Sequence, residues 1–250
     1  PPLHQETLAD LQAQLEGMVH LSFRLAELLG RREMEEANES DRALLRLLTP
    51  IAKLTTAKQA VAGTSEVIEA FGGAGYVEDT GLPPLLRDAQ VLPIWEGTTN
   101  VLSLDLLRGV KEVGGLAPLG DEFERCLTAI DAPSLQRTAQ EALDAFQTAA
   151  EWLRTAQADG PALQAGGRRF ALTIGHALEL AYTARHAQWS LRHEQDGRSA
   201  AAAERLASRP LTHITERDAG GAEALARDQD GSALSDRYDT TQTGATGDIV

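Results

Sequence analysis

Leucines and other apolar residues recur through most of this chain of 250 residues at spacings of three, four and seven positions. Such spacing places them on one face of an α-helix. The pattern is clear near the start of the chain, at Leu8, Leu11, Leu15, Met18, Leu25 and Leu28. We find no convincing strand alternation, so the sequence predicts an all-α fold built as an up-down helical bundle.

Capping and helix-breaking residues set the expected ends of the first two helices. A helix over residues 5–30 is expected to stop at Gly30, and Ser40 is a suitable N-cap for the second helix. Pro50 should kink this second helix, because proline lacks the N–H that an interior position uses. We expect the second helix to end at residues 72–73.

The remaining helices are predicted from the same signals. A short helix should open at residues 83–84, which are both proline. The helix after it, over about 98–110, carries apolar residues on most sides, so we expect it to be buried. Further helices are predicted over about 119–130, from 133 to 153, around 174–189 and over about 199–208, with breaks at 114–115, 160–161 and 166–167.

Composition divides the chain into three parts. Residues 1–112 are predicted to form the helical bundle, and residues 113–212 an additional helical segment that follows a glycine-rich linker. Residues 213–250 are rich in Gly, Asp, Thr and Ser and hold few large apolar side chains. This composition predicts a disordered acidic tail.

Charge and the rarer residues exclude several kinds of function. The net charge of −14 disfavours binding to nucleic acid or to an anionic membrane. No run of residues approaches the roughly 20 apolar positions of a membrane span. Cys126 is the single cysteine and the six histidines lack metal-ligand spacing, so we expect no disulfide and no metal site. These features favour a soluble, cytoplasmic protein.

The second half of the chain contains basic pairs such as Arg185–His186 and Arg192–His193. These pairs suggest a surface that binds nucleic acid. Acidic residues are interleaved with these pairs, which favours a solvated face rich in salt bridges. His176 lies among apolar residues and is interpreted as a core histidine.

The carboxylate of Glu96 stands immediately before a glycine and near the start of a predicted helix. If burial raises its pKa, it becomes a useful general base, and Ile94 and Trp95 would help to exclude water. A solvated glutamate at the start of a helix is the alternative, because the helix dipole favours a negative charge there. Spacing alone leaves both interpretations open.

The glycine pair Gly72–Gly73 follows a predicted helix rather than a strand, so it does not match the dinucleotide fingerprint. It is either a helix C-cap and turn or a place where exposed N–H groups meet a pyrophosphate. Thr98 and Asn100, near a helix N-terminus, are either ordinary capping residues or hydrogen-bond donors to an anion or a ribose.

Three motifs taken together resemble the C-terminal helical domain of flavin-dependent acyl-CoA dehydrogenases. They are FGGAGY at 71–76, LRDA at 86–89 and IWEGTTN at 94–100, in the order and spacing of that family. Trp95, Pro50 and the helices after Arg108 are similar to the AidB-like subgroup.

The resemblance implies a role for each matching residue. Glu96 corresponds to the base that removes the α-proton of an acyl-CoA thioester. Gly72 and Gly73 correspond to backbone that meets the FAD diphosphate, often in a neighbouring subunit, and Thr98 and Asn100 to contacts with the ADP portion of FAD. The family further implies an acyl-CoA substrate, a homodimer or homotetramer, and an electron acceptor such as an electron-transfer flavoprotein.

Two departures from the family pattern affect this interpretation. Glu69 stands where many members carry a glutamine that contacts FAD, and an ionised glutamate cannot donate a hydrogen bond. The N-terminal and middle β-domains of the family have no counterpart here, so we interpret the chain as a fragment that is inactive alone. The alternative is a non-catalytic helical module for oligomerisation or DNA-damage protection.

Overall fold

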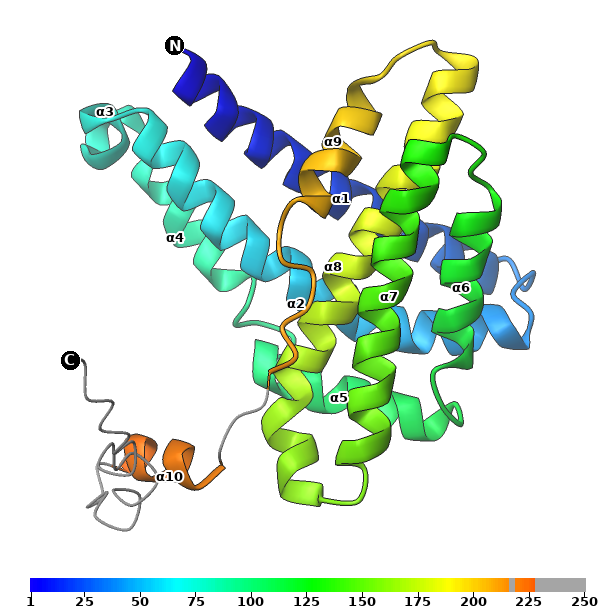
Figure 1. Cartoon of the computed structure of the whole chain (residues 1–250). Helices are drawn as coiled ribbons and strands as arrows, with labels where there is room; N and C mark the ends of the chain where they lie inside the picture. The colour runs from blue at the N-terminus through cyan, green and yellow to red at the C-terminus, as the bar shows by residue number, and fades with distance from the viewer. Residues whose placement is uncertain (216–218, 228–250) are drawn as a thin grey trace, which may run out of the picture. The chain divides into compact units, whose positions relative to one another are not determined.

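The computed structural model describes residues 1–215 and 219–227, and these residues form helices and connecting turns without a β-strand (Figure 1). The all-α prediction is therefore confirmed. Two compact units are present, residues 1–214 and residues 215–250. The second unit contains α10 (Ala219–Arg227); of the predicted acidic tail over 213–250, residues 216–218 and 228–250 lie outside the described residues.

The first unit holds two long helices, then a run of short ones, then three helices around a long α8. The elements are α1 (Pro2–Glu33), α2 (Glu39–Ala70), α3 (Gly73–Tyr76), the 3₁₀ helix η1 (Glu78–Thr80), α4 (Pro83–Val91), α5 (Thr99–Glu112), α6 (Ala117–Thr128), α7 (Pro133–Ala156), α8 (Gly160–His193) and α9 (Arg198–Ala207).

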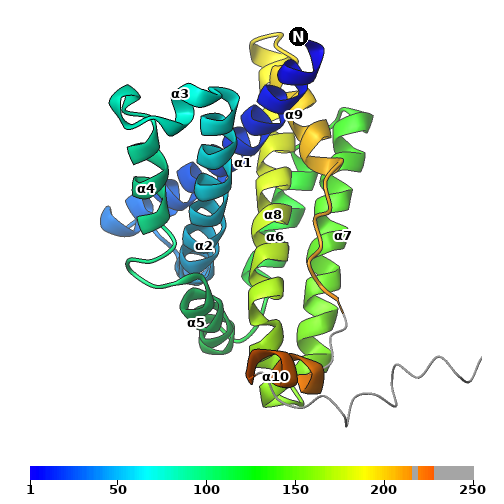
Figure 2. The same ribbon diagram turned by 90° about the vertical axis from the view of Figure 1, so that its left-hand side faces the viewer.

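Helix α8 lies at the centre of this unit. It packs against α1, α2, α5, α6, α7 and α9, and Figure 2 shows α7 on one side of it and α2, α4 and α5 on the other. Small residues let these neighbours come close. A Cβ on Gly175 would lie 2.1 Å from Thr55 Oγ1, and one on Gly166 would lie 2.0 Å from the Trp152 ring. The predicted break at 166–167 is therefore wrong, because these glycines make room for neighbours inside a continuous helix.

The apolar stripes predicted along the long helices form the core. Leu44, Leu47, Leu48, Ile51 and Leu54 of α2 are all buried. Because α5 packs against both α2 and α8, helices from both sides of the expected boundary near residue 112 belong to one compact unit. The division into residues 1–112 and 113–212 stays a prediction.

Two expected helix ends are corrected. Helix α1 continues past Gly30 to Glu33. Asn38, not Ser40, caps α2: its Oδ1 accepts from Asp41 N at 2.8 Å, while the Asp41 carboxylate accepts from Asn38 N at 3.3 Å. This reciprocal capping box satisfies two N–H groups at once, which Ser40 could not do alone.

Helix α5 is not buried on most sides, contrary to the prediction. Val101 is 51% exposed and Leu104 is 38% exposed, whereas Leu106 is fully buried. Only one face of α5 meets α2 and α8, so its other apolar face remains open to solvent. Among residues 1–215 and 219–227, no helix has both the length and the apolar character that a bilayer crossing needs.

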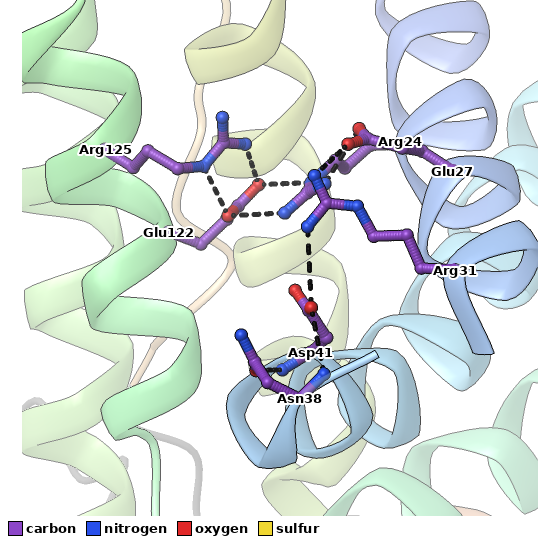
Figure 3. Close-up of polar contacts among 7 residues, drawn as sticks. All are labelled: Arg24, Glu27, Arg31, Asn38, Asp41, Glu122 and Arg125. Carbon is purple, nitrogen blue, oxygen red and sulfur yellow. Dashed lines mark hydrogen bonds and ion pairs between the residues drawn. The ribbon is translucent and has the colours of Figure 1, made fainter. Parts of the chain in front are cut away.

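A network of ion pairs ties α1 to α6 and to the start of α2 (Figure 3). Glu122 of α6 accepts from Arg24 Nε at 2.8 Å and from Arg125 Nε at 2.9 Å. Glu27 joins Arg24 to Arg31, which reaches Asp41 of the capping box. Burial alone would raise the Glu122 pKa, but the hydrogen bonds from Arg125 and Arg24 outweigh it and lower the pKa to about 2.

Candidate functional site

Glu96 lies in the turn between α4 and α5, and the backbone of this turn is unusual. Glu96 has a φ of 55°, a left-handed conformation that a residue with a Cβ rarely adopts. Gly97 has a φ of 118°, and a Cβ on it would lie 3.0 Å from Leu102 Cδ2. The glycine is therefore required both for the conformation and for the close approach of α5.

Lys53 of α2 anchors the segment just before Glu96. Its ammonium group donates to the carbonyl of Leu92 and, at 3.1 Å, to the carbonyl of Trp95. These bonds satisfy two carbonyls that a helix would otherwise use. No sequence motif predicted this role, although a lysine between the buried Ile51 and Leu54 is a signal that it has a specific partner.

We predict that Lys53→Met loosens the Glu96 turn while the rest of the fold survives. Losing both bonds should cost about 1–3 kcal/mol of unfolding free energy, because two carbonyls lose a charged donor. Hydrogen exchange of the amides over 92–98 should become faster. Lys58→Met on the same helix is the matched control, and equal exchange in the two variants would count against an anchoring role.

A groove of about 700 Å³ borders the Glu96 turn, with walls from α1, α2 and α5. Its charged lining consists of Arg32, Arg42, Arg46, Lys53, Glu96 and Asp105. Arg46 is held by Asp105 at 3.0 Å and by Glu112 at 2.7 Å, which fixes α5 to α2. With four cationic and two anionic side chains, the groove suits a ligand that carries negative charge.

The side chain of Glu96 itself is exposed to solvent. The burial that would make it an effective base is not provided by the described residues of this chain. Thr98 caps α5 without a side-chain hydrogen bond, and Asn100 follows in the first turn of the helix, both exposed. The structure therefore brings Glu96, Thr98 and Asn100 together at one exposed turn.

The second predicted element, Gly72–Gly73, lies at the far end of α2. Gly72 has φ 58° and ψ −137°, and a Cβ on either glycine would meet nothing within 4 Å, so this backbone is open to a ligand. Gly75 differs, because its Cβ would lie 2.1 Å from Ile68 O. Glu69 is exposed one turn before the pair.

The structure does not bring the two turns into one site. Figure 1 shows α3 at the end of α2 and α4 returning alongside α2. Lys53, which holds the Glu96 turn, precedes the end of α2 at Ala70 by 17 residues. At 1.5 Å per residue this separation is roughly 26 Å along the helix axis. Within one chain, the glycine pair and Glu96 therefore cannot touch the same small group.

These features define a class of protein: a helical bundle that carries a glutamate–glycine turn over a basic groove. The first 111 residues match the family model described as acyl-CoA dehydrogenase, C-terminal domain. Residues 1–111 are therefore similar to the C-terminal helical domain of the acyl-CoA dehydrogenase family.

Individual relatives agree with this similarity. The chain is 58% identical over 107 residues to acyl-CoA dehydrogenase family member 11 of Caenorhabditis elegans. This alignment covers 43% of this chain and 17% of that protein. It is 38% identical over 121 residues to the putative acyl-CoA dehydrogenase AidB of Escherichia coli. That alignment covers 48% of this chain and 22% of the relative.

A solved structure extends the likeness beyond the family domain. The crystal structure of Caenorhabditis elegans ACDH-11 in complex with C11-CoA aligns with a TM-score of 0.80 and 34% identity. The alignment covers 96% of this chain and 41% of that one. The helices after residue 111 thus have counterparts in a family member, and the chain spans less than half the length of each of these relatives.

Proposed function

We propose that this chain is the C-terminal part of an FAD-dependent acyl-CoA dehydrogenase in which Glu96 removes the α-proton of an acyl-CoA thioester. The observation that carries the proposal is the position of Glu96, on a turn that Lys53 anchors and Gly97 permits, at the edge of a basic groove. A general base must lie within reach of its substrate before its pKa matters, and the position of the turn beside the groove supports this role for Glu96.

The carboxylate needs a water-excluded setting to act as a base near neutral pH. In this proposal the setting comes from parts of the protein beyond the described residues, because Glu96 is exposed here. Ile94 and Trp95, 62% and 53% exposed beside it, offer apolar surface for such a cover.

FAD fits the described residues as two separate half-sites. Thr98 and Asn100 at the start of α5 would contact its ADP portion, and the open backbone of Gly72 and Gly73 would meet a diphosphate. When bound, FAD supplies the acceptor for the hydride that leaves the β-carbon. The separation of roughly 26 Å along α2 supports a role of the glycine pair in the FAD site of a second copy.

The tip at the end of α2 supports a homodimer or homotetramer. Phe71, Tyr76 and Val77 there are 56%, 87% and 47% exposed. Apolar side chains gathered around a glycine turn are what an interface with another copy would cover. An electron acceptor such as an electron-transfer flavoprotein would then reoxidise the cofactor.

The test is Glu96→Gln in the longest natural protein that carries this chain. We expect turnover to fall by about 10²–10⁴-fold while the flavin stays bound, because the amide keeps the shape of the side chain and loses the base. Glu66→Gln, an exposed residue of α2, is the matched control. Bleaching of the flavin spectrum by acyl-CoA is the direct readout.

Two results would overturn the proposal in different ways. Unchanged turnover in Glu96→Gln would remove Glu96 from the chemistry. A natural protein that binds neither flavin nor acyl-CoA would instead favour the non-catalytic helical module.

A further inference from the structure

A strap of residues 208–214 follows α9 and runs along α8 (Figure 1). Pro210 has no N–H to donate, which favours the end of α9 shortly before it. Ile214 is the last residue of the first unit, so the whole strap belongs to that unit. None of its residues lines the groove beside Glu96.

His213 attaches the strap to α8 through two hydrogen bonds. Its backbone N–H donates to Thr173 Oγ1 at 2.9 Å. Its ring nitrogen Nε2 lies 3.2 Å from Nδ1 of His176, and the two rings meet edge to face with their centroids 5.0 Å apart. No ion pair joins the strap to another element within the part of the chain that the structure describes. His176, interpreted from the sequence as a core histidine, is thus partly buried and bonded to the strap.

Few apolar contacts reinforce these bonds. Leu211 and Ile214 pack against the core, but both remain partly exposed, and Arg209, Pro210 and Thr212 are exposed. The long helix α8, by contrast, carries many fully buried side chains. A segment with few buried contacts and few backbone hydrogen bonds opens at a lower free energy than the core. The strap can therefore open while the bundle stays folded.

The hydrogen bond between the two imidazoles holds only one proton. One ring donates its N–H and the other accepts with an unprotonated nitrogen, so at least one of the two histidines must be neutral. Protonation of both rings removes the acceptor and leaves two cations with ring centroids 5.0 Å apart. Two like charges at this distance, partly removed from water, repel each other. The closed strap therefore disfavours the doubly protonated pair.

The surroundings of the pair add positive charge. Burial, the charge of His213 and the charge of Arg209 lower the pKa of His176 from 6.5 to about 4. Burial also lowers the pKa of His213. Arg169, one turn before Thr173 on α8, is a further cation near the strap.

The described elements packed around this part of α8 supply no anion to balance the pair. Glu179, one turn further along α8, has a pKa raised by burial to about 8, so it is uncharged in acid. Helix α2 presents the neutral side chains of Gln59 and Thr55 to α8. Of the described carboxylates on α1, α7 and α9, none acts on either imidazole.

We propose that His176 and His213 form a latch that keeps residues 208–214 closed against α8 and opens when acid protonates both rings. Opening uncovers the face of α8 that carries Thr173 and His176, and it separates Leu211 and Ile214 from the core. The inference does not depend on the dehydrogenase function, because no residue of the latch lines the groove beside Glu96.

The direction of the pH dependence follows from the lowered pKa values. In the open strap the two imidazoles are hydrated and titrate near the ordinary value of 6.5, whereas the closed strap binds protons more weakly. Falling pH therefore favours the open state between pH 6.5 and about 4, by up to about tenfold per pH unit for each proton taken up. Above pH 6.5 the latch stays closed.

Hydrogen exchange of the full chain at about pH 7 and about pH 4.5, corrected for the intrinsic exchange rates, tests the proposal. We expect the protection factor of the His213 amide, which donates to Thr173, to fall about tenfold or more at the lower pH. Amides in the middle of α7, such as that of Ala142, should keep their protection because α7 stays folded.

Two variants identify the titrating groups. His176→Phe keeps an aromatic ring against the strap but cannot take up a proton, so most of the pH dependence should disappear. His213→Phe makes the same change from the strap, outside the helices of the bundle, and it decides the matter if His176→Phe does not fold. His4→Phe, at an exposed position of α1, is the matched control and should respond to pH as the wild type does.

Three results would overturn the latch. Equal protection of the His213 amide at the two pH values would show that the histidines do not control the strap. A loss of protection in acid that is as large in the folded histidine variants as in the wild type would assign the opening to other groups. A parallel loss in α7 would show that acid unfolds the whole bundle rather than releasing the strap.

Discussion

Glu122→Gln should lower the free energy of unfolding by about 3–5 kcal/mol, a large part of the stability of an ordinary domain. Glu122 is 3% exposed, and its two oxygens accept four hydrogen bonds from Arg24 and Arg125. A neutral amide leaves the buried Arg24 guanidinium without this counter-ion and places an N–H₂ group against donors. Helix α1 would then lose its main polar tie to α6.

Chemical denaturation followed by circular dichroism measures this effect, with Glu112→Gln as the matched control. Glu112 also binds an arginine, Arg46 at 2.7 Å, but its side chain is 58% exposed. Because solvent screens such a pair, the control should change stability by no more than about 1 kcal/mol. Similar losses in the two variants would contradict a special role for the buried pair.

The pH dependence gives a second check on Glu122. Its folded-state pKa of about 2 lies below the ordinary value of 4.5. A lowered pKa means that the ionised carboxylate stabilises the fold above pH 4.5 and that this stabilisation is lost as the pH falls toward 2. The difference between the wild type and Glu122→Gln should therefore shrink over that interval.

How far the sequence predicts this fold depends on how local each signal is. The apolar stripe of α2 is a property of neighbouring residues, and all five of its predicted members are buried. The packing of Gly166 against Trp152 and of Gly175 against Thr55 depends on distant residues, so a glycine pair in sequence could be read only as a break. The pairing of Glu122 with Arg24, 98 residues away, had no local signal.

The candidate site shows the same division. The motif around Glu96 predicted a turn before a helix, and the structure contains it. The anchoring by Lys53 and the exposure of the Glu96 side chain depend on how α2 and α4 pack, so they did not follow from the motif. The length of α2 separates Glu96 from Gly72, although the sequence places them only 24 residues apart.

Glu179→Gln should stabilise the protein, and the gain should grow with pH. Glu179 of α8 is 1% exposed, and one carboxylate oxygen accepts from Gln59 Nε2 at 2.7 Å while the other has no partner. The Gln59 oxygen also lacks a partner. A glutamine at 179 would keep the existing bond and donate its own N–H to the Gln59 oxygen, so one substitution satisfies two buried groups.

The pH dependence follows from the direction of the pKa shift. Burial raises the pKa of Glu179 to about 8, although the Gln59 hydrogen bond and the charge of Arg209 offset part of the rise. The unfolded chain ionises near the ordinary value of 4.5, so the buried acid destabilises the fold increasingly as the pH rises from 4.5 to 8. Replacing it with a neutral amide removes this penalty.

We therefore expect the thermal unfolding midpoint of Glu179→Gln to exceed that of the wild type by roughly 5 °C at pH 8, for a gain on the order of 2 kcal/mol. Near pH 4 the carboxyl is protonated in both states, so the two midpoints should nearly coincide. Glu204→Gln, an exposed glutamate of α9, controls for the change in net charge. A difference that is equal at both pH values would show that packing rather than ionisation of Glu179 sets the effect.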